Sequence, residues 1–260
     1  MDETTGKGRA VISADTCAME RVLFPRRVTI LAGHFGSGKT EIALNGALGL
    51  AAGGLEVSLV DLDVVKPYFR SRSAREFLRQ AGVELVAPEG EFFSSDLPII
   101  LPQVRGALGD RSRKVLMDAG GDDTGARVVG SLTDAIPVGE TDFLLVLNFR
   151  RPFTPDADSA LVMAREIEAT ARLKITGLIS NTHLMKETTL DVVMAGHDMA
   201  LRTSSLLGIP LVALTVKDAL LNAAQEAAPG CPVIPLRPLV KPAFEEERGQ
   251  RKVGPLFVVG

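Results

Sequence analysis

Cysteine, histidine and net charge are all scarce in this sequence. The 260 residues include two cysteines, Cys17 and Cys231, and neither has a second cysteine at metal-ligand spacing. This spacing argues against an iron–sulfur or zinc site built from the chain's own cysteines. The formal charge of −3 provides no global basic field of the kind that binds nucleic acid.

Long apolar runs are also missing. No segment approaches the roughly 18 apolar residues of a membrane helix. The first residues carry acidic side chains, unlike a secretory signal. We therefore expect a cytoplasmic protein without a membrane partner or a specific nucleic-acid partner.

What the sequence does contain is a series of short apolar runs that alternate with amphipathic stretches. Most runs are continuously apolar, which is typical of strands covered on both faces. This alternation predicts an α/β fold with a doubly wound, mostly parallel sheet and helices on both faces, with one late antiparallel edge strand as an option. The strands are expected in residues 26–33, 55–63, 83–88, 114–121, 142–149, 175–181, 210–216 and 231–236.

The remaining segments define the expected domain organisation. We expect a flexible N-terminal extension at residues 1–25, one nucleotide-binding domain at residues 26–240 and a tail at residues 241–260. Apolar spacing predicts a helix in residues 154–172, with Thr154 as its cap and Pro155 at its first position. A second helix is expected to stop at Gly208.

The stretch "GHFGSGKT", residues 33–40, fits the pattern G-x-x-x-x-G-K-[ST] and lies between a predicted strand and a predicted helix. A polyphosphate held by successive backbone N–H groups at a helix N-terminus requires a loop without bulky Cβ atoms. Lys39 is expected to reach the β- and γ-phosphates, and the Thr40 hydroxyl to bind Mg²⁺. The predicted nucleotide-binding set in this loop is Gly33, His34, Phe35, Gly36, Ser37, Gly38, Lys39, Thr40 and Glu41.

The sequence resembles the deviant-Walker P-loop ATPases of the MinD/ParA/CobQ-like (SIMIBI) class. The phosphate loop matches that class except that His34 and Phe35 replace a lysine and a glycine. The second-strand motif is present as "VDLD", and the Walker B stretch as "VLMDAGG". In that class the loop lysine crosses a nucleotide-sandwich dimer, so the resemblance implies a homodimer as an option. An unperturbed histidine has a pKa of about 6.5 and cannot hold a permanent charge at this place.

Aspartates lie at the ends of the second and fourth predicted strands, where we expect them to face the Mg²⁺–phosphate complex. By resemblance Asp63 orients the nucleophile and is, with Lys39, a catalytic candidate. Asp118 would hold Mg²⁺ through water, with Thr40 and Asp61 as further metal candidates. Gly121 would bring a backbone N–H towards the γ-phosphate. The alternative is that these aspartates close strands and cap helices.

The base is expected to be adenine. A guanine-specific N-K-x-D motif is absent from "ISNTHL", where Leu184 stands at the aspartate position and supplies no acceptor. Asn181 can bond an adenine edge, as it does in the resembled ATPases. The loop is also similar to that of metallochaperone GTPases, but His34, His183 and His197 form no Cys–His cluster, and His197 falls on an apolar helical stripe.

Basic residues follow the second and fifth predicted strands. Lys66, Arg70, Arg72, Arg150 and Arg151 form a candidate second-ligand set for an anionic co-substrate. A solvated basic face is the alternative. Three functions stay open: an ATP-driven switch acting on a partner protein or enzyme complex, a kinase or ATP-dependent ligase acting on a small anion, and a metal-delivering GTPase. ATP and Mg²⁺ are the expected cofactors.

Overall fold

Eight strands form one parallel sheet, in the order β3-β2-β4-β1-β5-β6-β7-β8. The computed structural model describes residues 14–63, 72–87, 97–121 and 123–239. The strands are β1 Val28–Ala32, β2 Val57–Asp61, β3 Val83–Val86, β4 Lys114–Asp118, β5 Thr141–Leu147, β6 Gly177–Ser180, β7 Leu211–Lys217 and β8 Val233–Leu236. Each lies in a predicted segment, within one residue. Because β8 pairs with β7 in parallel, the optional antiparallel edge strand does not occur among the described residues.

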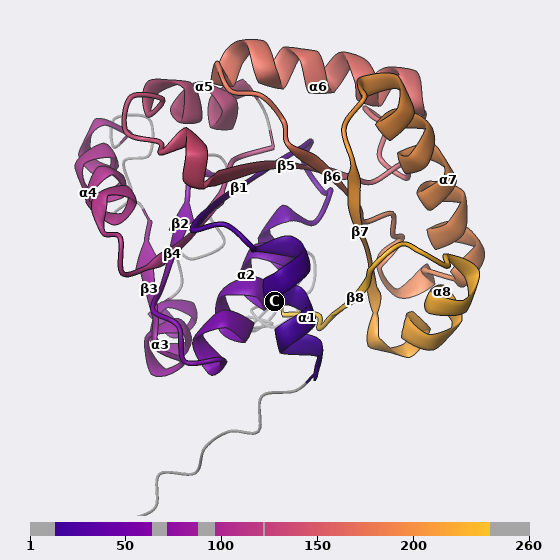
Figure 1. The fold of residues 1–260 in the computed structure, drawn as a ribbon, viewed down its shortest axis with the longest axis horizontal. Helices are drawn as coiled ribbons and strands as arrows, with labels where there is room; N and C mark the ends of the chain where they lie inside the picture. The colour runs from indigo at the N-terminus through magenta and orange to yellow at the C-terminus, as the bar shows by residue number, and fades with distance from the viewer. Residues whose placement is uncertain (1–13, 64–71, 88–96, 122, 240–260) are drawn as a thin grey trace, which may run out of the picture.

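Helices cover both faces of this sheet, as the sequence predicted (Figure 1). They are α1 Ala14–Leu23, α2 Lys39–Ala52, α3 Arg72–Gln80, α4 Leu97–Gly109, α5 Asp123–Ser131, α6 Ala157–Ala171, α7 Leu190–Leu207 and α8 Leu221–Ala227. Helices α1 and α2 pack on one face in a core shared with β1, β2 and β8. Helices α4 to α7 contribute to a second core on the other face. Among the described residues no helix is long and apolar enough to cross a membrane.

The N-terminal segment is more ordered than the sequence predicted. Residues 14–23 form α1, and Met19, Leu23 and Phe24 are buried. Phe24 lies against α2 where a Cβ at Gly46 would come within 2.4 Å of the Phe24 ring. The expectation of a flexible extension is therefore wrong for residues 14–25, because an opening at Gly46 admits an aromatic ring that the helix brings to it. Residues 1–13 and the predicted tail at residues 241–260 lie outside the described residues.

The loop before α6 also differs from the prediction. Asp156, not Thr154, caps α6, because its side chain accepts a hydrogen bond of 2.8 Å from the Ser159 amide. The Thr154 hydroxyl is buried and donates instead to the Asn148 carbonyl, 3.1 Å away. Helix α7 ends at Gly208 in the left-handed conformation, as predicted.

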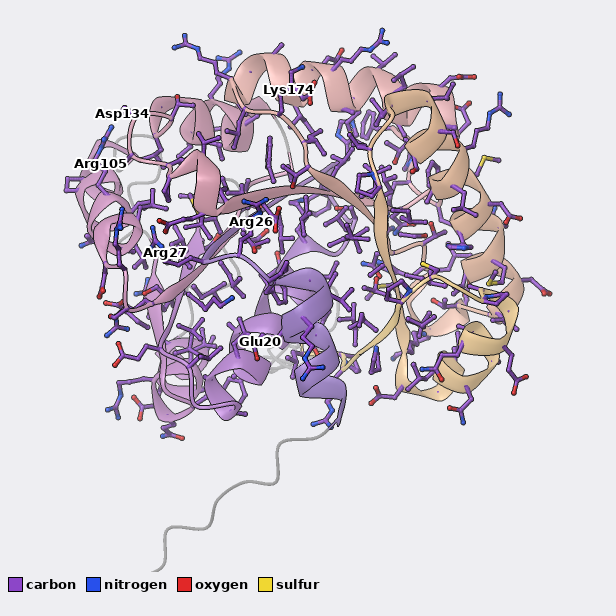
Figure 2. The ribbon with its side chains drawn as sticks, viewed as in Figure 1. Glu20, Arg26, Arg27, Arg105, Asp134 and Lys174 are labelled. Atoms are coloured by element: carbon purple, nitrogen blue, oxygen red, sulfur yellow. The ribbon has the colours of Figure 1, made fainter. Side chains whose placement is uncertain are left out.

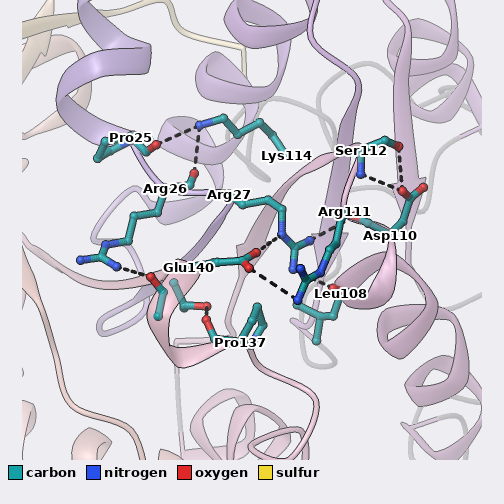
Figure 3. A network of polar contacts seen from close by, with 12 residues as sticks. Pro25, Arg26, Arg27, Leu108, Asp110, Arg111, Ser112, Lys114, Pro137 and Glu140 are labelled. Carbon is teal, nitrogen blue, oxygen red and sulfur yellow. Dashed lines mark hydrogen bonds and ion pairs between the residues drawn. The ribbon is translucent and has the colours of Figure 1, made fainter.

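The amino ends of the strands are joined by charged side chains. Arg27 donates to the Glu140 carboxylate and to the carbonyls of Leu108 and Asp110 (Figure 3). Lys114 donates to the carbonyls of residues 24, 25 and 26. At the periphery, the Arg105 and Asp134 side chains join α4 to the segment after α5 (Figure 2). These contacts fix the edge of the sheet opposite to the phosphate loop.

Candidate functional site

The predicted site residues meet at the carboxyl ends of the central strands. The phosphate loop follows β1, and Asp61, Asp118, Asn148 and Asn181 lie at or just after the ends of β2, β4, β5 and β6. Hydrogen bonds join the loop to Asp118, Asn148 and Asn181. In open parallel sheets this edge is where ligands bind.

The loop has the backbone conformation that its glycines predict. Gly33, Gly36 and Gly38 have φ angles of 138°, 77° and 93°, a region that residues with a side chain rarely adopt. Helix α2 begins directly afterwards at Lys39, so the loop leads into a helix N-terminus. Backbone N–H groups at such a terminus favour bound anions.

The glycines are required for a reason that the sequence did not reveal. A Cβ would come within 2.4 Å of the Val146 carbonyl oxygen at Gly33, and within 2.9 Å of the Arg151 Nε at Gly36. At Gly38 it would come within 2.1 Å of the Asn181 Nδ2. The close approach that we assigned to a phosphate is thus also imposed by the protein's own strands and loops.

Donors from several elements hold the carbonyl groups of the loop. The Lys39 ammonium, on a residue only 6% exposed, donates to the carbonyls of Gly33 and His34 at 2.9 and 3.3 Å. The Asn181 Nδ2 donates to the Ser37 carbonyl at 2.7 Å. These hydrogen bonds tie the carbonyl oxygens of the loop to Lys39 and to the end of β6.

Asn148 contacts the phosphate loop, and the sequence analysis missed it. Its Nδ2 donates to the Gly36 carbonyl at 3.2 Å, and the Arg151 Nε donates to the same oxygen at 2.8 Å. The sequence feature that could have indicated it is a polar residue directly after the apolar strand β5. That feature does not show which distant carbonyl the amide reaches.

The tip of the loop carries apolar side chains beside a second glycine segment. Phe35 is 58% exposed, and the His34 ring lies 5.4 Å from the ring of Phe153, centroid to centroid. A Cβ at Gly121 would come within 2.5 Å of the Phe35 amide nitrogen. The structure therefore brings Gly121 to the loop, as the predicted site requires.

Asp118 and Thr40 form the clearest candidate metal site. The Thr40 hydroxyl donates to the Asp118 Oδ2 at 2.5 Å. Asp118 is 1% exposed, and its Oδ1 has no hydrogen-bond partner among the described residues. Burial raises the pKa of Asp118 to about 6, Lys39 and the Thr40 hydroxyl oppose the rise, and the nearby charge of Asp63 adds to it. A buried carboxylate in this state favours a bound cation.

Asp61 and Asp63 lie beside this pair. Asp61 is paired in register with Asp118 on the neighbouring strand and is buried. Its Oδ1 accepts a hydrogen bond of 2.9 Å from the Asp63 amide, so Asp61 orders the turn that presents Asp63. Asp63 itself is partly exposed. Asp61 and Asp63 thus lie near Asp118, and Asp63 is the one that is partly exposed.

The donor set fits Mg²⁺. A threonine hydroxyl and aspartate carboxylates supply the oxygen ligands that this ion prefers, and Mg²⁺ keeps several waters of its own. The buried Asp118 Oδ1 is an oxygen atom that such an ion would satisfy. No group of three or more His, Cys, Asp or Glu side chains suited to a metal ion occurs in the described part of the chain.

Two predicted nucleotide contacts have other partners in the structure. The Glu41 carboxylate accepts from the Leu239 amide, and Asn45, one turn later, exchanges hydrogen bonds with the Arg237 backbone. Glu41 therefore holds the segment after β8 against α2. Asn181, expected at the adenine edge, has both ends of its amide engaged, because its Oδ1 also accepts from the Thr215 hydroxyl at 2.9 Å.

The candidate second-ligand set is only partly described. Arg150 is exposed, whereas Arg151 is partly buried against the loop, and burial lowers its pKa. Arg72 begins α3, and its side chain lies outside the described part. Lys66 and Arg70 lie outside the described residues. Beside Arg151, burial and then the charges of Arg151 and Lys217 lower the pKa of His183 to about 4, so this histidine is neutral at pH 7.

Comparisons with known proteins agree with this architecture. FtsY from Elizabethkingia anophelis in complex with GDP is 18% identical, with 74% of this chain and 57% of that chain covered and a TM-score of 0.50. FtsY from Mycoplasma mycoides is also 18% identical, with 74% and 60% covered and a TM-score of 0.46. The BceF tyrosine kinase domain is 23% identical, with 65% and 74% covered and a TM-score of 0.39.

This chain thus spans 57% and 60% of the two FtsY chains. No protein-family model matches the sequence, and a search of curated proteins found no match. At these identities the likeness concerns the fold alone. The fold, an all-parallel sheet with helices on both faces, matches that of P-loop NTPase structures.

Proposed function

We propose that this protein binds and hydrolyses Mg-ATP and acts as a nucleotide-dependent switch or accessory factor for a partner protein or enzyme complex. The proposal includes the MinD/ParA/CobQ-like subclass, since the loop, "VDLD" and "VLMDAGG" occur in that order. A cytoplasmic location and a homodimer are parts of the same proposal.

The observation that carries the proposal is the buried charge around Thr40. Asp118 and Lys39 are both nearly inaccessible, and burial raises the pKa of Asp118 to about 6 although the charge of Lys39 lowers it, so the burial of this carboxylate is only partly compensated. A polyphosphate would bring negative charge to the Lys39 ammonium, and Mg²⁺ would bring positive charge to Asp118. Together they complement the site without changing the fold.

Each residue of the site has a separate role in the proposed hydrolysis. Lys39 and the N-terminus of α2 would stabilise charge on the transferred phosphoryl group. Thr40 and Asp118 would hold Mg²⁺, which screens the phosphate charge when bound. Asp63 is the partly exposed carboxylate beside Asp118, a position from which it would orient the attacking water.

We propose adenine as the base because Leu184 supplies no acceptor for the guanine N1 and N2 donors. One of the structurally similar proteins, FtsY from Elizabethkingia anophelis, was solved with GDP, so competition binding is the direct test. ATP should displace a bound fluorescent nucleotide at a concentration about tenfold lower than GTP. A clear preference for GTP would reverse this assignment.

A kinase or ligase for a small anion is the second candidate. Arg151 supports it, because this partly buried cation has no carboxylate within ion-pair distance among the described residues and lies against the phosphate loop. An anionic co-substrate would compensate such a charge.

Steady-state turnover separates the two candidates. The switch predicts slow hydrolysis by the purified chain, which a fraction of cell extract containing a partner protein accelerates. The kinase or ligase predicts phosphate transfer that requires a dialysable metabolite. Turnover that rises only with the dialysable fraction would reject the switch in favour of the second candidate.

A further inference from the structure

Asn148, the residue after β5, bonds to the phosphate loop and to the loop after β6 as well as to its own loop. Its side chain is buried, on a residue 1% exposed, and makes four hydrogen bonds, each to a backbone group. The Oδ1 accepts from the amides of Arg150 and His183, at 3.0 and 3.3 Å. The Nδ2 donates to the carbonyls of Gly36 and His183, at 3.2 and 3.4 Å. One side chain thus joins the phosphate loop to the loops after β5 and β6.

The Gly36 carbonyl is the most consequential of these partners. It belongs to the peptide between Gly36 and Ser37, whose N–H donates to the His34 carbonyl at 3.2 Å. Gly36 has a φ of 77°, and glycine also populates other regions of φ and ψ readily. If this peptide rotated, it would present a carbonyl oxygen in a loop whose binding of anions depends on N–H groups.

We propose that Asn148 is a positioning residue that fixes the orientation of the Gly36–Ser37 peptide and thereby keeps the loop in its phosphate-binding form. The N–H and the carbonyl of His183 both bond to the Asn148 side-chain amide and hold it in place. We call the hydrogen bond from Asn148 to the Gly36 carbonyl the clamp. Arg151 supports it, since its Nε donates to the same Gly36 oxygen at 2.8 Å. This proposal rests on the proposed nucleotide-binding function and assigns part of it to a residue that need not touch the ligand.

The sharpest test changes the donor and keeps the shape. Asn148→Asp keeps an oxygen to accept from Arg150 and His183, but it replaces the donor to the Gly36 carbonyl with a second acceptor. We expect the affinity for Mg-ATP, measured by calorimetry, to fall at least about tenfold, because misplaced binding groups carry penalties of this size. Mg-tripolyphosphate should lose affinity by the same factor, because the clamp acts on the phosphates and not on the base.

Thr154→Val is the matched control. Thr154 is equally buried in the same loop, and its hydroxyl donates to the Asn148 carbonyl without reaching the phosphate loop. This variant should lower the unfolding temperature as Asn148→Asp does, while its affinity for both ligands stays at the wild-type value. Equal affinity losses in the two variants would overturn the proposal, because they would show a general loss of structure.

A second pair of variants keeps the test decisive if Asn148→Asp folds poorly. Asn148→Ala removes the clamp without adding charge, and Arg151→Lys removes the second donor to Gly36. Because both donors share one acceptor, the losses of affinity in the double variant should not be additive. Wild-type affinity in Asn148→Ala, with binding lost in Lys39→Ala, would overturn this inference and leave the proposed function intact. Wild-type protein that binds neither ligand would overturn both.

Discussion

The two ends of the sheet use charge in different ways. At the amino end, arginines are matched with carboxylates: Arg27 and Arg111 with Glu140 (Figure 3), Arg26 with Asp142, and Arg113 with Asp110. At the carboxyl end, Lys39, Asp118 and Arg151 are buried or partly buried, and their hydrogen bonds run to backbone carbonyls and a hydroxyl.

This difference separates stability from function. Exposed ion pairs contribute little individually and serve to tie elements together. Buried charged groups are costly, and groups whose pKa is shifted by burial and nearby charges, such as Asp118, gather at functional sites. The comparison therefore predicts that substitutions at the amino end change stability, whereas substitutions at the carboxyl end change ligand binding and turnover.

The largest effect is expected from Asp63→Asn. The change keeps the shape and removes the charge that would orient the attacking water. Single-turnover hydrolysis should slow by about 10² to 10⁴, or roughly 3 to 5 kcal/mol, with little change in ATP affinity. Asp142→Asn, which breaks the ion pair with Arg26 at the amino end, should leave hydrolysis unchanged. Hydrolysis at the wild-type rate by Asp63→Asn would remove the catalytic role from this residue.

A second effect appears in the pH dependence of stability without nucleotide or Mg²⁺. The pKa of His183 falls from 6.5 to about 4 on folding, so the unfolded chain binds more protons between these values and stability rises with pH. The pKa of Asp118 rises from 3.8 to about 6, so stability falls with pH over that window. Each shift of about two units corresponds to roughly 3 kcal/mol, and the two oppose each other.

Substitution separates these two contributions. Asp118→Asn should make the free energy of unfolding rise more steeply between pH 4 and 6.5 than in the wild type, and should weaken Mg²⁺-dependent ATP binding. His183→Gln should make the same curve fall. Denaturant unfolding at four pH values in this window measures both slopes. Slopes equal to that of the wild type in both variants would show that these groups are not buried as described.

A smaller effect is expected at the amino end. Arg27→Ala removes three hydrogen bonds, to the Glu140 carboxylate and to two backbone carbonyls. We expect the free energy of unfolding to fall by about 1 to 3 kcal/mol, the usual range for hydrogen bonds to charged groups. Mg-ATP affinity should not change. A loss of Mg-ATP affinity in Arg27→Ala would contradict the separation of stability at the amino end of the sheet from ligand binding at its carboxyl end.

Much of the fold follows from local sequence. All eight strands were predicted, because a strand covered on both faces is continuously apolar and is bounded by turns. Helix α1 was missed, since its order depends on the fit of Phe24 against Gly46, a contact between distant segments. The cap of α6 was misplaced by two residues because the Thr154 hydroxyl is taken up inside the preceding loop.

The candidate site divides in the same way. The spacing "GHFGSGKT" predicted the loop and its glycines, since those requirements are local. Asn148 and the true partners of Asn181 and Glu41 were not predictable, because each bonds a backbone group more than 100 residues away along the chain. A polar residue at a strand end shows where a contact can form, and the tertiary structure decides with what.

The most direct test compares the two lysines that bond backbone carbonyls at opposite ends of the sheet. Lys39 donates to the carbonyls of Gly33 and His34, and Lys114 to those of residues 24–26. Mg-ATP binding by calorimetry and unfolding by denaturant should be measured for Lys39→Ala and Lys114→Ala. The account predicts that Lys39→Ala folds and loses ATP binding, whereas Lys114→Ala is less stable and binds ATP like the wild type. Equal ATP affinity in the wild type and Lys39→Ala would contradict it.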